Sequence, residues 1–240
     1  MEYLDKAKWR EDLHQPDWYL LLKQDFKNLE KLAEELEVKG QPHKQVKQEA
    51  YAMLEEAMRE GYLPIAETGP DEDHKRQPID TIVIHHTKNQ PGMTLERLNA
   101  MHMLRIYGSH YASLTDPNLK GQPVWSGHFF EGKQVFWTYH WLVREDGFAE
   151  QILEDKYIGW QAGNWDINTR SIAICIDDDL SDKEPSKAVI EAIARIIRQR
   201  YPRVSPERII GHCDAYQNTI CPGHLFHKSW RSKLIEILAA

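Results

Sequence analysis

The first part of the chain has apolar residues at helical spacing. Over residues 17–37 they recur at steps of three and four, which gives one helix a single apolar face. A second stripe of this kind runs over residues 46–58, after a break at Gly40 and Pro42. The pattern predicts an N-terminal α-helical hairpin over residues 1–66. Because two helices cannot cover both of their apolar faces by themselves, we expect the hairpin to pack on the rest of the chain or on a protein partner.

The pattern changes after residue 66. Residues 67–78 are polar and contain chain breakers, so we expect them to form a linker. From residue 79 to 240, β-branched runs alternate with helical stripes. The runs predict strands over residues 80–85, 136–144, 148–153 and 171–176. The stripes predict helices over residues 95–104, from Pro185 onwards, after Ser205-Pro206, and over 227–238. This alternation predicts an α/β domain in which a central mixed β-sheet is flanked by helices.

Charge and composition exclude several classes of protein. The formal net charge is −7 and no basic run stands out, so we expect no nucleic-acid partner. No segment approaches the roughly 18 uninterrupted apolar residues of a membrane span. The first residues lack the apolar core of a secretory signal, so we expect a cytoplasmic protein or one released by a non-classical route to act on cell-wall material. The three cysteines are too few for a disulfide framework and are expected to be reduced.

Two histidine motifs indicate a metal site. The run Ile-Val-Ile-His-His-Thr occupies residues 82–87, and Gly-His-Cys-Asp at 211–214 is followed by Cys-Pro-Gly at 221–223. Imidazole nitrogens and a thiolate sulfur are ligands that zinc prefers. Two histidines and one cysteine would leave a fourth coordination position open, as in catalytic zinc sites, where that position can hold the reacting water. We therefore expect one Zn²⁺ per chain, although the residues alone do not choose between neighbouring donors.

Four blocks then carry a resemblance to a known family. Residues 82–87, 139–147, 162–174 and 211–223 match it in order, and 139–147 read Tyr-His-Trp-Leu-Val-Arg-Glu-Asp-Gly. Positions 79 to 235 resemble the zinc-dependent N-acetylmuramoyl-L-alanine amidases of the type shared by bacteriophage T7 lysozyme and the peptidoglycan recognition proteins. The resemblance implies the fold expected above, and it implies hydrolysis of the amide between the lactyl group of N-acetylmuramic acid and L-alanine. The implied substrate is peptidoglycan or a muropeptide.

The resemblance also assigns roles to residues. Zinc would be bound by His85 rather than His86, by His212, and by Cys221 rather than Cys213. Tyr139 and Thr219 would be catalytic, with the tyrosine hydroxyl beside the metal. The expected substrate-binding residues are His86, Asn164, Trp165, Asn168 and Arg170. Both ligand histidines need second hydrogen-bond partners, for which His86 and His140 are candidates.

Departures from the family pattern show where the resemblance is weaker. Gln161 stands where the family usually has the histidine of a His-Ala-Gly run, and Thr219 stands where some phage members have lysine. Residues 107–132 are expected to be an insertion bordering the substrate cleft. The N-terminal hairpin lies outside the resemblance, so its function cannot be taken from the family.

Two other classes of function remain open at this point. One is a non-catalytic peptidoglycan-binding module, although such modules generally lack the cysteine ligand that this chain has as Cys221. The other is an interaction protein with a structural metal, whose N-terminal helices bind a partner. A fourth protein ligand would favour that reading, and no residue has the spacing for one.

Overall fold

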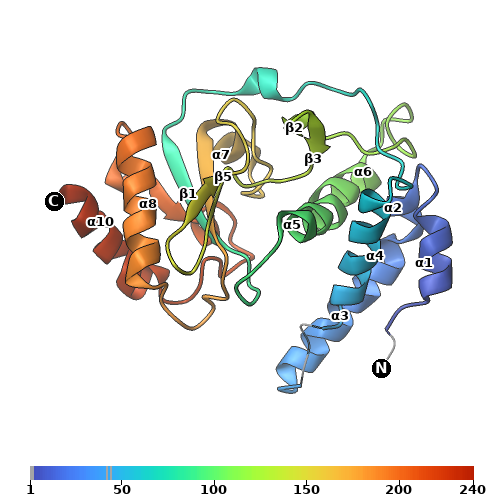
Figure 1. Ribbon diagram of the computed structural model, residues 1–240, viewed down its shortest axis with the longest axis horizontal. Helices are drawn as coiled ribbons and strands as arrows, with labels where there is room; N and C mark the ends of the chain where they lie inside the picture. The colour runs from blue at the N-terminus through green and yellow to red at the C-terminus, as the bar shows by residue number, and fades with distance from the viewer. Residues whose placement is uncertain (1–2, 42, 44) are drawn as a thin grey trace. The chain divides into compact units, whose positions relative to one another are not determined.

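The computed structural model describes residues 3–41, 43 and 45–240, and it divides into two compact units (Figure 1). The first unit holds the described residues up to Pro70 together with Thr94–Gly127 and Gln134–Phe136. The second unit holds Asp71–Met93, His128–Lys133 and Trp137–Ala240. The two short strands β2 (His128–Phe130) and β3 (Lys133–Val135) lie where the chain changes from one unit to the other.

A five-stranded mixed sheet forms the centre of the second unit. Its order is β5-β4-β6-β1-β7. The strands are β1 (Thr81–His86), β4 (Trp141–Val143), β5 (Ala149–Gln151), β6 (Ser171–Ile176) and β7 (Ile209–Gly211). Strand β1 runs parallel to β6 and β7, β4 runs parallel to β6, and β5 is antiparallel to β4. Every residue of β1 and β6 is buried, as expected of central parallel strands covered on both faces.

Helices complete the second unit. Helix α8 (Lys187–Arg200) begins at Ser186, whose hydroxyl accepts a hydrogen bond from the backbone N–H of Val189. Its inner face, including Ile193 and Ile197, is buried in a core shared with the sheet strands and the C-terminal helices. The remaining helices of this unit are η1 (Asp73–Lys75), α7 (Trp165–Arg170), η3 (Pro206–Arg208), α9 (His212–Ala215), η4 (Phe226–Trp230) and α10 (Arg231–Ala239). The predicted mixed sheet flanked by helices is confirmed.

The predicted strand over residues 136–144 was too long. Regular pairing begins only at Trp141, because at His140 a side-chain nitrogen replaces the backbone carbonyl as the acceptor towards β6. The backbone N–H of Ala173 donates to His140 Nδ1 at 3.1 Å, while the N–H of His140 donates to the carbonyl of Ala173 at 3.0 Å. A side-chain acceptor of this kind satisfies the donor on β6 but ends the repeat of a strand.

The first unit is helical. It contains α1 (Lys6–Asp12), α2 (Trp18–Leu21), α3 (Lys23–Val38), α4 (Gln48–Arg59), α5 (Leu95–His102), the π-helical turn η2 (Met103–Gly108) and α6 (Ser109–Ser113). Helices α3 and α4 are the two of the predicted hairpin, and Figure 1 shows α3 in blue and α4 in blue-green. The predicted first helix is divided at Leu22, and α1 was not predicted.

Residues 94–127, which the sequence pattern assigned to the α/β domain, belong to this helical unit because they cover its apolar stripe. Helix α5 packs on α4, and Arg97 joins the two by donating to the carboxylate of Glu55 at 2.5 Å and to the side chain of Gln48 at 2.7 Å. Farther along, the hydroxyl of Tyr19 accepts from the N–H of Gly121 at 2.7 Å and donates to the carbonyl of Gln122 at 3.0 Å. The place of 107–132 beside the substrate cleft stays a prediction.

Candidate metal centre

The topology of the second unit brings two histidines to one edge of its sheet. His85 lies on β1, and His212 follows directly after β7, which pairs with β1 in parallel through Ile84 and Gly211. The carboxyl ends of parallel strands meet at the same edge of a sheet, which is where open α/β folds place their sites. The two imidazole rings are 4.7 Å apart between centroids.

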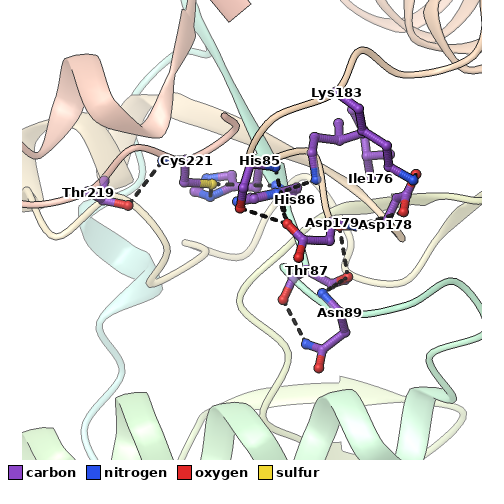
Figure 2. Close-up of polar contacts among 12 residues, drawn as sticks. His85, His86, Thr87, Asn89, Ile176, Asp178, Asp179, Lys183, Thr219 and Cys221 are labelled. Carbon is purple, nitrogen blue, oxygen red and sulfur yellow. Dashed lines mark hydrogen bonds and ion pairs between the residues drawn. The ribbon is translucent and has the colours of Figure 1, made fainter. Parts of the chain in front are cut away.

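The loop after α9 brings a sulfur to the same place. Cys221 Sγ lies 3.7 Å from His85 Nδ1 (Figure 2). One donor atom from each of His85, His212 and Cys221 lies within 4.8 Å of the other two. The three residues that the resemblance assigned as ligands are therefore gathered, and the assignment of a metal to them belongs to the proposal below.

The backbone around Cys221 is held by specific contacts. Its N–H donates to the hydroxyl of Thr219 at 3.1 Å, and its carbonyl accepts from the N–H of Cys213 at 2.8 Å. The N–H of His86 points at Cys221 Sγ, at 3.4 Å. A hydrogen-bond donor on the sulfur favours its thiolate form, which is the form that binds metal.

The second ring nitrogen of His85 contacts Gln161, a residue that was not among the predicted site residues. His85 Nε2 lies 2.5 Å from the side-chain oxygen of Gln161. The amide nitrogen of Gln161 donates to the hydroxyl of Ser171 at 2.9 Å. The sequence signal was present, because Gln161 is the position that departs from the family's usual histidine.

Tyr139 lies next to the histidine cluster, as the resemblance implied. Its ring is 4.9 Å from that of His85, centroid to centroid. Burial raises the pKa of the neighbouring Cys175 thiol well above its ordinary value, and a hydrogen bond between that thiol and Tyr139 acts in the opposite direction. Cys175 therefore stays protonated, and the catalytic role of Tyr139 stays a prediction.

His86 is buried, and its side chain makes different contacts from that of His85. Its Nδ1 accepts a hydrogen bond from the N–H of Leu180 at 2.9 Å and lies 4.0 Å from a carboxylate oxygen of Asp179 (Figure 2). Burial lowers the pKa of His86 to about 4, so its imidazole is neutral near pH 7. These contacts are structural, and a role in binding substrate stays a prediction.

The other predicted substrate residues lie on or before α7. Asn164 caps the helix, with its side-chain oxygen accepting from the N–H of Ile167 at 3.3 Å. Trp165 is 41% exposed and meets Trp160 edge to face. Asn168 is buried, and Arg170 forms ion pairs with two aspartates, at 3.4 and 3.5 Å. Trp165 therefore offers an accessible aromatic surface, whereas the polar side chains of the other three form hydrogen bonds or ion pairs within the protein.

A second group of metal-binding residue types lies close by in the same unit. Cys213, Asp214 and His227 each offer one donor atom, and these atoms lie within 4.8 Å of one another. One carboxylate oxygen of Asp214 accepts from the N–H of Gly211 at 2.8 Å, and the other lies 2.9 Å from His227 Nε2. A helix cap and the contact with His227 therefore hold the Asp214 carboxylate in place without an ion.

Comparison with known proteins shows which family the chain resembles. Residues 75–224 match the model of the N-acetylmuramoyl-L-alanine amidase family. A curated relative, the 1,6-anhydro-N-acetylmuramyl-L-alanine amidase AmpD of Haemophilus influenzae, is 27% identical over 139 residues, which are 49% of this chain and 74% of that protein.

Solved structures were also found. The amidase LysC of Clostridium intestinale is 18% identical, with a TM-score of 0.49, over 72% of this chain and 95% of that one. The Ph2119 endolysin of a Thermus scotoductus bacteriophage is 22% identical, with a TM-score of 0.44, over 68% of this chain and 86% of that one.

The family match spans more than half of the chain and includes His85, His212 and Cys221. The chain belongs to the N-acetylmuramoyl-L-alanine amidase family. It is accordingly a hydrolase of peptidoglycan catabolism, with a peptidoglycan-related substrate. Among the residues that the structure describes, no helix has the length and apolar character needed to cross a membrane.

Proposed function

We propose that this amidase works with one Zn²⁺ per chain, bound by His85, His212 and Cys221, and cleaves the amide between the lactyl group of N-acetylmuramic acid and L-alanine. The observation that supports the metal is the convergence of two imidazoles and one thiol within 4.8 Å. Such a set matches the softness and the tetrahedral habit of zinc. With three protein ligands, the set leaves one position for water or substrate.

The donors also meet the chemical requirements of a catalytic zinc site. When bound, zinc lowers the pKa of water towards ~7 and polarises a carbonyl oxygen. The N–H of His86 donates to Cys221 Sγ and so stabilises the thiolate. The side-chain amide of Gln161 is hydrogen-bonded to Nε2 of His85. These contacts leave His85 Nδ1 directed at Cys221, where a shared ion would lie.

Two further residues of the chain act on the substrate in this proposal. The Tyr139 hydroxyl donates a hydrogen bond to the oxygen that becomes negative as water attacks the amide carbon. The proximity of the Tyr139 ring to that of His85, 4.9 Å between centroids, supports this role. Thr219 assists the same reaction from the side opposite Tyr139. Its hydroxyl also fixes the loop by accepting a hydrogen bond from the N–H of Cys221. The chain's cysteine ligand argues against a purely binding role.

Mass spectrometry of muropeptide digests tests the proposal. We expect the wild-type protein to separate sugar from peptide with the gain of one water, and a chelator to stop the reaction. Cys221→Ser should be inactive. Its matched control is Cys213→Ser, in the same region and only partly buried, which should remain active.

Two outcomes would contradict the proposal in different ways. Cleavage that is equally fast in chelator and in Cys221→Ser would exclude zinc dependence. Zinc binding without cleavage of any substrate would favour the non-catalytic binding module. Because the Haemophilus relative is named for a 1,6-anhydro substrate, the digests should include an anhydro-muropeptide, a reducing muropeptide and intact peptidoglycan.

A further inference from the structure

We propose that Gln161 is a positioning residue that fixes the tautomer of His85 and thereby sets the affinity of the site for zinc. The inference rests on the zinc dependence proposed above and concerns a residue at which this chain departs from its family. His85 can bind a metal through Nδ1 only if its proton resides on Nε2. The nitrogen that faces Gln161 is Nε2, and the one that faces Cys221 is Nδ1.

Gln161 is itself held rigidly. It is 5% exposed, and its backbone N–H donates to the side-chain oxygen of Asn168 at 3.2 Å. The next N–H, of Ala162, donates to the same oxygen at 2.8 Å. The side-chain nitrogen of Gln161 donates to Ser171 at 2.9 Å, which leaves its oxygen for His85 at 2.5 Å. Backbone and side chain are therefore both fixed, and the amide presents an acceptor to the imidazole.

A half-buried arginine, Arg76, secures both anchors of Gln161. Arg76 Nη1 donates to the backbone carbonyls of Asn168, Thr169 and Ser171, at 3.1, 3.2 and 3.0 Å. Its Nε donates to the carbonyl of Asp155 at 3.0 Å. A guanidinium shared among several carbonyls ties the end of α7 to the start of β6. The series of contacts thus runs from Arg76 through Asn168 and Ser171 to Gln161, and from Gln161 to His85.

The orientation of the Gln161 amide decides which ring nitrogen of His85 carries the proton. With oxygen towards His85, the imidazole must donate from Nε2 and Nδ1 carries a lone pair. With the amide reversed, its N–H₂ would donate to Nε2 and the proton of a neutral His85 would move to Nδ1, where it would oppose a metal. A serine hydroxyl accepts or donates and so tolerates either orientation. Because outer hydrogen-bond partners of metal-binding histidines set ligand basicity and tautomer, the first orientation is the one compatible with a zinc ligand.

The test measures zinc affinity and the His85 tautomer separately. Affinity is measured by competition with a chromophoric chelator, and the tautomer by imidazole ¹⁵N NMR of the zinc-free wild-type protein. Gln161→Leu removes the acceptor and should weaken zinc binding about 10- to 100-fold. Gln161→Glu keeps an acceptor oxygen and should bind zinc with an affinity close to that of wild type. Gln77→Leu, the same change at an exposed position of the same unit, is the matched control and should have no effect.

The outcomes separate this inference from the proposed function. Zinc affinity unchanged in folded Gln161→Leu, or a wild-type His85 protonated on Nδ1, would overturn the role of Gln161 while leaving zinc dependence intact. A wild-type protein that binds no zinc would overturn the proposed metal, while the NMR measurement would still decide the tautomer. If Gln161→Leu fails to fold, the tautomer of His85 in the wild-type protein decides the question.

Discussion

The adjacent residues His85 and His86 on β1 show how two neighbouring histidines of one strand make entirely different contacts. Successive side chains of a strand point to opposite faces, so His85 and His86 cannot serve the same site in the same way. His85 faces the sulfur of Cys221, whereas His86 accepts a hydrogen bond from Leu180 and contributes only its backbone N–H to that sulfur.

The first residue-scale prediction follows from this difference. His85→Ala and Cys221→Ser each remove a donor from the cluster and should release most of the zinc, because a site of three protein ligands loses a full bond. His86→Ala keeps the three donors and should retain the metal. Elemental analysis of the purified variants measures this. The assignment of ligands is wrong if His86→Ala loses zinc while His85→Ala keeps it.

A second prediction concerns Tyr139. Tyr139→Phe removes one hydroxyl beside His85 and leaves the donor cluster intact, so zinc content should not change. Turnover should fall roughly tenfold to a thousandfold, the range expected for the loss of one donor to a developing oxyanion. Steady-state kinetics on a muropeptide, with zinc content measured on the same sample, check both parts. Unchanged turnover would limit Tyr139 to packing and to its contact with Cys175.

The pH dependence of stability gives a third prediction. Burial lowers the pKa of His140 to about 3, against about 6.5 in the unfolded chain. Between these two pKa values, His140 is protonated in the unfolded chain but neutral in the folded protein. Stability from this group is complete above about pH 6.5 and falls as pH drops towards 3, by up to ~1.4 kcal/mol per pH unit.

His140→Gln is the variant that measures this slope. Glutamine can still offer an acceptor towards the N–H of Ala173 and a donor towards the carbonyl of Tyr157, the two partners of the imidazole. Urea unfolding between pH 4 and 7 should show a shallower loss of stability in the variant than in wild type. Parallel curves would mean that His140 does not titrate on unfolding in this range.

Which site residues can be predicted from sequence depends on what defines them. His212 and Cys221 stand in short motifs of metal-binding residue types, so the residues themselves indicated a zinc site. The choice of His85 over His86 required the family resemblance, because alternation along a strand does not reveal which face carries the site. Gln161 was noticed only as a departure, since its importance comes from a contact with His85 across the fold.

At the scale of elements, the loop after Cys221 depends on a close backbone approach. A Cβ on Gly223 would lie 1.8 Å from the carbonyl oxygen of Leu180, and the φ of Gly223 is +124°. Gly223→Ala therefore adds a backbone clash to a strained conformation, and the loop must move. Since Cys221 is two residues away, both the melting temperature and zinc affinity should fall.

Gly92→Ala provides the control for this fourth prediction. Gly92 has a similar φ of +101°, but nothing lies within 4 Å of an added Cβ. This variant should lose only the stability that the strained backbone costs, about 1 kcal/mol or slightly more, and should bind zinc normally. Thermal unfolding and chelator competition on both variants compare them. Equal effects at the two positions would show that the contact with Leu180 is unimportant.

Elements with a long, repeated pattern were predicted well, and short ones were not. Strands β1 and β6 and helix α8 carry unbroken apolar signals and were found within a few residues of their predicted bounds. Strand β7 and helix α9 are too short for periodicity to show, although both help to position His212. Strand β4 was overestimated because a histidine side chain takes the place of a backbone acceptor.

At the scale of the whole molecule, the sequence predicted that the apolar stripe of the hairpin packs on the rest of the chain or on a partner, but not which segment covers it. The stripe of α3 and α4 belongs to a unit that also holds residues 94–127, a segment distant in sequence. Periodicity within one helix identifies a buried face without identifying its partner, which depends on tertiary packing. The unit therefore includes residues that lie within the amidase family match.

Deleting residues 1–66 should consequently uncover the apolar face of α5 and its neighbours. We expect a melting temperature lower by several degrees and increased binding of a hydrophobic dye, because a large exposed apolar patch is unfavourable in water. The three metal donors belong to the other unit, so zinc should remain bound. A truncated chain that is equally stable and monomeric would mean that the hairpin is an independent module for a partner or for wall targeting.

Zinc dependence of the amidase reaction is the central claim, and a titration of the metal-free protein tests it most directly. Zinc is removed with a chelator that is then dialysed away, Zn²⁺ is returned in fractions of an equivalent, and muropeptide cleavage is followed by mass spectrometry. We expect no cleavage without metal, a linear rise, and a plateau at one equivalent per chain. Full cleavage by the metal-free protein, or a plateau unrelated to one equivalent, would contradict the account.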